Sequence, residues 1–293
     1  MTIHNHGARA DWAERSGGWV QNQDVLDRAF APFTSAVMEA VGVAREERVL
    51  DVGCGPGTLL ETASRLGARA VGVDISAEMV AAARSRVPDA EVIEGDAQVT
   101  DLLDAAPGRP FDAVVSRFGT MFFEDPVAAF TNIRVACAPG ARLAMVTWRS
   151  GEQDLFTCGL EPLLARLDDP PGPPPEDRPG PMGLATEEHL RAVLLEAGWD
   201  EVHLVALTAR CDYRTRSTDG ADERMAVALS GSVGRVALER ARRELGAEEL
   251  HGLLDRARGL LAERAGHRGV GFDARAWLTA ARCNPQAVAG SGR

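Results

Sequence analysis

Lysine is missing from the 293-residue sequence, in which arginine occupies all 32 positions that hold either lysine or arginine. Without lysine the chain has no Schiff-base nucleophile and no phosphate-binding loop of the lysine-containing type, so both chemistries are excluded. Long apolar runs are missing as well. No stretch of 18 apolar residues occurs, and we therefore expect neither a membrane-spanning helix nor a membrane partner.

Cysteine is sparse and irregularly spaced. Residues 1–11 are polar and lack the apolar segment of a signal peptide, which argues against export. The five cysteines follow no C-x-x-C pattern, so we expect no disulfide framework, no zinc site and no other metal. Both features predict a cytoplasmic protein. The cysteines are Cys54, Cys137, Cys158, Cys211 and Cys283.

Positive charge is also in the minority. The formal net charge is -11 and no basic stretch stands out, so nucleic acid is not expected as a partner. Hydrophobic residues make up 45% of the chain, which is enough to bury a sizeable core. We interpret residues 1–293 as one domain, and a homo-oligomer is compatible with this composition.

Glycine is concentrated in one informative place. Residues 49–57 read Val-Leu-Asp-Val-Gly-Cys-Gly-Pro-Gly, which predicts a buried strand, a turn through Gly53, Gly55 and Gly57, and a following helix. The third glycine comes one position earlier than in the dinucleotide fingerprint G-x-G-x-x-G. Asp51 would repel a pyrophosphate but attract the ammonium and sulfonium of S-adenosylmethionine (SAM). The spacing D-x-G-x-G-x-G therefore favours SAM over NAD.

Two further aspartates follow the next predicted strands. Asp74 suits the two ribose hydroxyls, because each carboxylate oxygen can accept a hydrogen bond. Asp96 is placed to accept from the adenine amino group. A single aspartate after a strand is often only a helix cap or turn residue, but three behind a glycine turn favour a ligand site at the carboxyl ends of the strands. The remaining adenine contacts are assigned to neighbouring backbone N–H groups and apolar side chains: Ala97, Gln98, Ile75 and Met79.

Strands alternate with helices as far as residue 148. Strands are expected over 48–52, 70–74, 90–94, 111–118 and 142–148, and helices over 20–43, 58–66, 76–86 and 126–138. This α/β order predicts a parallel sheet with helices on both faces. Beyond it we expect a proline-rich loop over 168–181, a helix over 186–197, and strands over 201–213 and 274–282. Residues 12–43 are interpreted as an N-terminal helical lid, and 150–185 and 215–268 as helical cap insertions.

Five segments resemble the successive motifs of class I SAM-dependent methyltransferases: 49–57, 71–79, 94–98, 111–118 and 139–148. The stretch Phe-Asp-Ala-Val-Val-Ser-Arg-Phe-Gly-Thr-Met-Phe-Phe-Glu-Asp-Pro is similar to small-molecule methyltransferases related to the ubiquinone/menaquinone-biosynthesis C-methyltransferases. The resemblance implies a Rossmann-like three-layer sandwich, whose seven-stranded, mostly parallel sheet has an antiparallel edge strand. By position it also implies contacts of the glycine turn with the methionine part of SAM, and of Ser116 with the sulfonium. The turn contributes Gly53, Cys54, Gly55 and Gly57.

Methyl transfer from a sulfonium is an in-line displacement with a good leaving group. Proximity and alignment can supply most of the catalysis, and a base is needed only if the acceptor must lose a proton. The catalytic residues therefore stay open, with His189, His203 and Arg117 as candidates. Arg117 either pairs with an acidic group of the substrate or with a neighbouring carboxylate.

Aromatic and apolar side chains are candidates for the acceptor side. Phe118, Met121 and Phe122 either line a substrate pocket or belong to the core. Trp12, Trp19 and Gln23 either form part of the lid over the cofactor or pack against the N-terminal helix. Nothing in the spacing of these residues decides between the two interpretations.

The favoured function is SAM-dependent methylation of a small or medium-sized organic acceptor, with S-adenosylhomocysteine (SAH) as product, in bacterial secondary or cofactor metabolism. An alternative is a methyltransferase-like protein that retains SAM or SAH as a structural ligand while catalysing a cyclisation or rearrangement. Turnover without consumption of SAM would distinguish it. An NAD-dependent oxidoreductase is disfavoured by Asp51 and by the glycine spacing.

Overall fold

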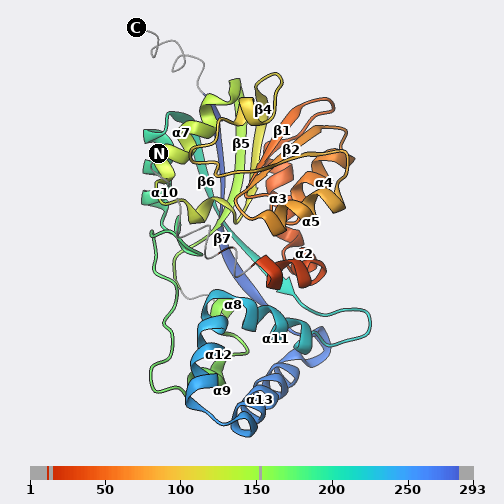
Figure 1. Ribbon diagram of the computed structural model, residues 1–293, viewed down its shortest axis with the longest axis vertical. Helices are drawn as coiled ribbons and strands as arrows, with labels where there is room; N and C mark the ends of the chain where they lie inside the picture. The colour runs from red at the N-terminus through yellow and green to blue at the C-terminus, as the bar shows by residue number, and fades with distance from the viewer. Residues whose placement is uncertain (1–11, 13–15, 152–153, 284–293) are drawn as a thin grey trace.

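One seven-stranded sheet forms the centre of the computed structural model, which describes residues 12, 16–151 and 154–283 (Figure 1). The strands are β1 Arg48–Val52, β2 Arg69–Asp74, β3 Glu91–Glu94, β4 Phe111–Arg117, β5 Cys137–Trp148, β6 Trp199–Asp212 and β7 Gly271–Cys283. Their order across the sheet is β3-β2-β1-β4-β5-β7-β6. All pair in parallel except β7, which runs antiparallel to β5 and β6. The predicted α/β fold is confirmed, with the antiparallel strand one place inside the edge.

The strand order reverses between β1 and β4. From β1 the chain moves outward to β2 and β3, and then returns to β4 on the other side of β1. Ligands of open α/β sheets bind at the carboxyl ends of strands beside such a switch point. The fold therefore places a site where β1 and β4 end.

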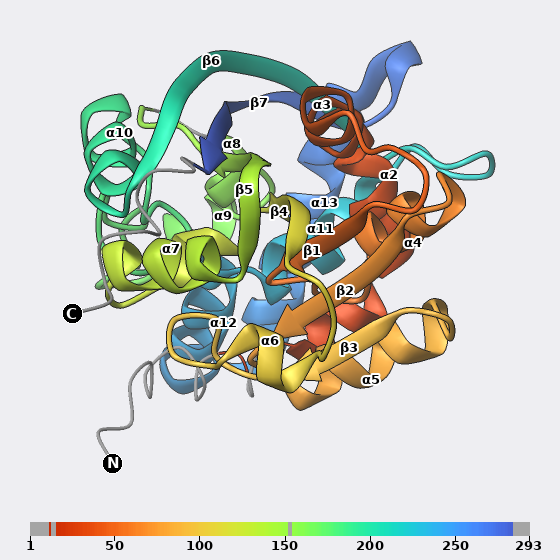
Figure 2. The same ribbon diagram turned by 90° about the horizontal axis from the view of Figure 1, so that it is seen from above.

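Helices cover both faces of the sheet, as Figure 2 shows. Alternate strand residues enter opposite cores: Val49 and Val115 pack with Phe33 on one face, whereas Leu50 packs with Ile133 on the other. The helices of the first face are α2 Gln23–Ala29, α3 Ala31–Val41, α4 Thr58–Arg65 and α5 Ala77–Arg86; those of the second are α6 Leu102–Ala105, α7 Pro126–Val135 and α10 Glu187–Glu196. These layers form the expected three-layer sandwich.

The helix expected over residues 20–43 is divided. Gln23–Ala29 and Ala31–Val41 are separate helices with Phe30 between them. Pro32 stands in the first turn of α3 and has no N–H to donate to the carbonyl of Arg28, so one continuous helix would leave that carbonyl unsatisfied. The division turns α2 toward the end of the sheet where β1 and β4 finish.

A second group of helices lies beyond one end of the sheet, where the long strands β6 and β7 reach it (Figure 1). We call these the cap helices: α8 Asp154–Thr157, α9 Glu161–Leu164, α11 Ala221–Ser230, α12 Ser232–Glu244 and α13 Ala247–Ala265. They have small cores of their own, such as Leu163 with Ala237 and Leu253. The described residues also form two 3₁₀ turns, η1 Thr120–Phe122 and η2 Gly266–Arg268. The functional roles of lid and cap stay predictions.

No helix within the described residues is both long and apolar enough to cross a membrane.

Candidate cofactor and acceptor site

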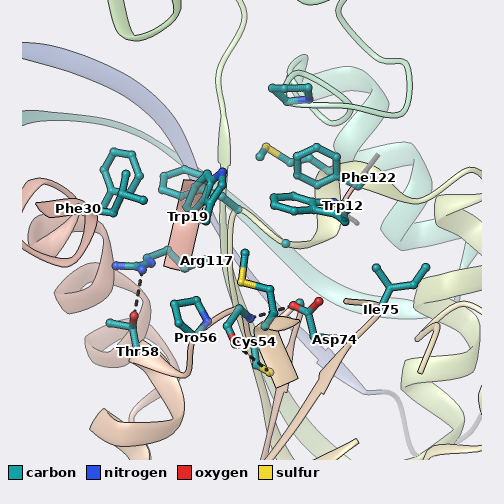
Figure 3. Close-up of a pocket in the computed structure, with 18 of the residues that line it drawn as sticks. Trp12, Trp19, Phe30, Cys54, Pro56, Thr58, Asp74, Ile75, Arg117 and Phe122 are labelled. Atoms are coloured by element: carbon teal, nitrogen blue, oxygen red, sulfur yellow. Dashed lines mark hydrogen bonds between the residues drawn. The ribbon is translucent and has the colours of Figure 1, made fainter. Parts of the chain in front are cut away.

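A cavity opens at the carboxyl ends of β1, β2 and β4, between the sheet and the cap helices (Figure 3). It brings together most of the side chains selected from the sequence. Those that line it are Trp12, Trp19, Asp51, Gly53, Cys54, Gly55, Asp74, Ile75, Met79, Asp96, Ala97, Arg117, Phe118, Met121 and Phe122.

The glycine turn after β1 is packed directly against the turn after β4. Gly53 has a φ of 64°, and a Cβ on it would lie 2.7 Å from the Cα of Gly119. A Cβ on Gly119 would lie 2.6 Å from the carbonyl oxygen of Val52. Two backbones can approach this closely only without side chains. Gly119 lines the cavity and was not among the predicted residues, although a glycine directly after the fourth strand was a signal.

Asp74 is held in place by backbone N–H groups. Gly55 donates to its Oδ2 and Ser76 to its Oδ1, both at 2.9 Å. Burial raises the pKa of Asp74, and these N–H donors oppose the rise. Each oxygen keeps a further lone pair, so a carboxylate fixed in this way can accept from two hydroxyl groups. Asp74 therefore fits the two ribose hydroxyls of SAM, and this role stays a prediction.

Asp51 is 2% exposed, and its Oδ2 has no hydrogen-bond partner among the described residues. Burial raises the pKa of Asp51 to about 8; Arg117 opposes this rise and Asp74 adds to it. A buried carboxylate oxygen without a hydrogen bond is stabilised by a cation. The ammonium of SAM would supply one, so the residues present fit this cofactor.

Asp96 and Gln98 have different positions relative to the cavity. The N–H of Gln98 donates to Oδ1 of Asp96 at 2.9 Å, and Oε1 of Gln98 accepts from the N–H of Asp125. Asp96 and Ala97 line the cavity, whereas Gln98 does not. Gln98 fastens the loop after β3 to the start of α7, and its contact with adenine stays a prediction.

Three other predicted cofactor contacts lie outside the described lining of the cavity. Gly57 begins α4, and a Cβ on it would lie 3.3 Å from Cα of Ala83, so it permits close packing of α4 on α5. Ser116 is fully buried, and its hydroxyl donates to the carbonyl of Val52 at 2.7 Å, which ties β4 to β1. Gln23 lies in α2 and does not reach the cavity.

The two candidate histidines are also absent from the described lining. His189 lies in the first turn of α10, where its backbone N–H donates to the cap residue Thr186. His203 is exposed on β6, the edge strand far from β1 in the sheet order. A role for either histidine as a base stays a prediction, which these positions do not favour.

Arg117 belongs to a buried polar network. It donates to Thr34 at 2.9 Å, to Thr58 at 3.1 Å and to Asp27 at 3.3 Å. Arg86 donates to the second oxygen of Asp27 at 2.6 Å. Burial alone would raise the pKa of Asp27, but Thr58 and the two arginines outweigh it and lower the value. Figure 3 shows Arg117 between Phe30 and Thr58. The arrangement favours pairing with a neighbouring carboxylate, and it ties α2 to the start of α4.

Residues 16–21 are helical and bridge the two sides of the cavity. The hydroxyl of Ser16 donates to Glu78 of α5 at 2.5 Å. A Cβ on Gly18 would lie 2.8 Å from Cβ of Ser230, at the end of α11. This segment therefore touches the nucleotide side and the cap helices together.

Aromatic rings form the wall between these two sides. Phe118 stacks on Trp148 with ring centroids 3.7 Å apart, and Trp12 meets Phe122 edge to face at 5.0 Å. Phe118 has a φ of 63°, a left-handed conformation that costs energy in a bulky residue and occurs preferentially at functional sites. Phe118 and Met121 are almost fully buried and also line the cavity, so they belong to the core and to the wall together. Trp148 was not predicted.

The cap helices contribute the part of the lining that the sequence did not indicate. No local motif marks these residues, because several elements distant in the chain supply them. They are Leu155, Phe156, Arg224, Val227, Ala228, Ser230, Gly231, Ser232 and Val233.

Comparisons with known proteins agree with this geometry. A family model described as "Methyltransferase domain" matches residues 49–140. A demethylmenaquinone methyltransferase of Beutenbergia cavernae is 30% identical over 187 residues, which cover 59% of this chain and 74% of the relative. The chain belongs to the class I SAM-dependent methyltransferases. Within that family it is similar to the quinone-biosynthesis group.

Solved structures share the fold over most of this chain. The YcgJ protein of Bacillus subtilis matches with a TM-score of 0.55 at 16% identity, covering 87% of this chain and 99% of that one. Phosphoethanolamine N-methyltransferase 2 of Haemonchus contortus, solved with SAM, matches with a TM-score of 0.53 at 19% identity, covering 95% and 60%. At these identities the likeness shows the fold. Family membership confirms the predicted enzyme class and SAM as its cofactor.

The methyltransferase spans less than half the length of some curated relatives. Uncharacterized proteins of Mycobacterium tuberculosis are 28% identical over 128 residues, which cover 42% of this chain and 45% of the relative.

Proposed function

We propose that this protein transfers the methyl group of SAM to a small or medium-sized organic acceptor, in bacterial secondary or cofactor metabolism in the cytoplasm. The observation that supports this most strongly is the continuity of one cavity. Carboxylates line it at the strand ends, aromatic rings line its middle, and the cap helices close its far side. A cationic donor and an apolar acceptor can therefore meet in one enclosed space.

The donor end is assigned by charge and hydrogen bonding. Asp51 would pair with the ammonium of SAM, Asp74 with the ribose hydroxyls, and Asp96 with the adenine amino group. Ile75 and Met79 would pack against the adenine. The cofactor, when bound, supplies an activated methyl group on a sulfonium. The protein's residues hold this group toward the aromatic wall formed by Phe118, Trp148, Trp12 and Phe122.

Catalysis is proposed to rest on alignment and exclusion of water. No histidine lies among the described lining residues, and Arg117 is engaged with Asp27. We therefore assign no general base. Residues 12–43 are proposed to act as the lid and the cap helices to enclose the acceptor, because Ser16 and Gly18 contact opposite sides of the cavity.

Incubation of the purified protein with methyl-labelled SAM and fractionated extracts of the host tests this proposal. We expect label to enter the small-molecule fraction, with SAH formed in equal amount. Asp74→Ala should abolish the transfer, and Asp89→Ala, at an exposed position outside the cavity, is the matched control. Label found only in macromolecules would overturn the proposed acceptor class. Turnover of a small molecule with no loss of SAM would instead support the cyclisation or rearrangement alternative.

A further inference from the structure

Two buried arginines line the cavity, and their surroundings differ. Arg117 has the carboxylate of Asp27 at 3.3 Å. Arg224 of α11 is 1% exposed, and within the part of the chain that the structure describes no carboxylate forms an ion pair with it. A buried cation is costly without a counter-charge. Arg224 is therefore the unusual one of the two.

The contacts of Arg224 are with dipoles and ring faces. Its Nε donates to the carbonyl of Cys158 at 3.0 Å, and its Nη2 donates to the carbonyl of Leu155 at 2.8 Å. These bonds use two of the five N–H groups of a guanidinium. The group also lies over the rings of Phe272 and Tyr213, at 4.9 and 5.4 Å from their centroids. The contacts orient Arg224 beside the cavity and leave its charge without an anion.

The N-terminus of α12 reaches the same cap side of the cavity. This 13-residue helix begins at Ser232, and no side chain caps it. Gly231, Ser232 and Val233 all line the cavity. The first N–H groups of a helix have no intrahelical acceptor, and together with the helix dipole they attract anions. A buried cation and an uncapped helix terminus thus supply positive potential to one side of the cavity.

We propose that Arg224 and the N-terminus of α12 form an anion subsite that binds an acidic group of the acceptor, with an aromatic body of the acceptor against Trp12 and Phe122. This assignment rests on the proposed methyl transfer and specifies the substrate class as an aromatic acid. The carboxylate of Asp74, at the donor end, would repel the acidic group. Attraction at the cap and repulsion at the strand ends therefore fix which end of the acceptor approaches the methyl group.

Calorimetric binding of three probes to the SAH-loaded protein tests the subsite. The probes are 2-naphthoate, 2-naphthalenesulfonate and the neutral 2-naphthamide, which share one ring system. We expect at least one of the two anions to bind the unsubstituted protein about 10- to 100-fold more tightly than the amide, as hydrogen bonds to a charged group predict. Arg224→Gln should remove that preference. Tighter binding of only one anion identifies the acidic group as carboxylate or sulfonate.

A second pair of variants isolates the helix terminus. Ser232→Pro removes the N–H of the first helical residue, a position that proline suits. The preceding Gly231 has φ -71° and ψ 170°, the conformation favoured before proline. Ser232→Ala removes the hydroxyl but keeps the N–H. The proline variant should lose about threefold or more in anion binding relative to the alanine variant.

Binding of SAH is measured first, so that two failures can be separated. No SAH binding would overturn the proposed function itself. Intact SAH binding with no preference for either anion, or an unchanged preference in Arg224→Gln, would overturn only the anion subsite. Arg258→Gln, which removes an exposed ion pair with Asp222 of the same cap helices, is the control for cap stability. If Arg224→Gln does not fold, equal anion binding by the two Ser232 variants overturns the proposal.

Discussion

The two ends of the cavity are built by different means. At the donor end, consecutive residues of single strand-turn units carry the chemistry, and backbone N–H groups of Gly55 and Ser76 orient Asp74. At the cap end, Arg224 is oriented by carbonyls of a segment about 70 residues earlier in the chain, at Leu155 and Cys158. The donor end is a local structure, whereas the cap end depends on tertiary packing.

This difference explains why the sequence at the donor end resembles the motifs of a family, whereas the sequence at the cap end does not. Few sequences can form a turn whose backbone lies directly against another backbone, because glycine is needed at the contact. A wall made of helix faces tolerates many, provided that size and polarity are kept. The predictions below test the contrast, from the largest expected effect to the smallest.

Removal of the Asp74 carboxylate should damage the donor end most. Asp74→Ala is expected to weaken SAH binding by roughly 100-fold or more, because two hydrogen bonds to a charged group are lost. Calorimetry measures the loss, with Asp89→Ala as the matched control. Unchanged affinity would mean that Asp74 orders the glycine turn and does not hold the ribose.

Proton binding by Asp51 should make the donor end sensitive to pH. The pKa of Asp51 in the empty protein is raised to about 8. Binding of SAH should therefore release the proton of Asp51 when the pH is below about 8. The affinity for SAH should rise by up to roughly tenfold per pH unit between about pH 6 and 8, and then level off. Asp51→Asn should give a flat and weaker profile. A sloping profile in that variant would assign the proton to another group.

The same group affects the stability of the empty protein. A folded-state pKa above the ordinary value of 3.8 means that the folded state keeps a proton that the unfolded state has already lost. The contribution to stability is therefore present at low pH and is lost as the pH rises through about 8. Denaturant unfolding of the protein and of Asp51→Asn across this range provides the check.

The contact between the two turns allows a steric test. Gly119→Ala places a methyl group 2.6 Å from the carbonyl of Val52, so we expect a loss of about 2 kcal/mol in the free energy of unfolding, together with weaker SAH binding. Gly172→Ala, where a Cβ has nothing within 4 Å, is the control. Similar stability of the two variants would show that the turns can separate freely.

The network around Asp27 joins the local and the long-range parts of the site. Asp27→Asn should lower the free energy of unfolding by about 1–2 kcal/mol, because the ion pairs of Asp27 with Arg86 and Arg117 are partly shielded from water. The pKa of Asp27 is lowered, so its contribution is present above the ordinary value and is lost at more acidic pH. The free energies of unfolding of the unsubstituted protein and of Asp27→Asn should therefore converge near pH 3. Asp24→Asn, exposed on the same helix, should show no such pH dependence.

The smallest effect is expected from the histidines. His189→Ala and His203→Ala should leave the methyl-transfer rate within about twofold, because neither side chain belongs to the described lining of the cavity. Parallel rate measurements on both variants are sufficient. A large loss in either would require a movement that carries α10 or β6 toward the strand ends.

Sequence reasoning succeeded where one residue type has one structural use. The run from Val49 to Gly57 predicted the strand, the turn and the position of Asp51, because glycines and a carboxylate at that spacing have few alternative uses. Ser116 and Gly57 were also assigned to the cofactor, but the structure shows them in packing contacts between strands or helices and not in the described lining of the cavity. Periodicity could not reveal Arg224, because an arginine on an amphipathic helix ordinarily faces water. Only the three-dimensional arrangement shows its burial.

One hydrogen bond, at the end of the β6–β7 pair where the chain leaves for the cap helices, shows how α11–α13 are joined to the sheet. The N–H of Tyr213 donates to the carbonyl of Val270 at 2.9 Å, so the chain leaves the sheet for α11–α13 and returns to it at the same point. The segment is therefore joined to the sheet at two neighbouring points, and it also contacts α8 and α9, for example through Arg224 and Leu163. Replacement of α11–α13 at these two points would alter the cap side of the cavity and leave the strand order of the sheet unchanged.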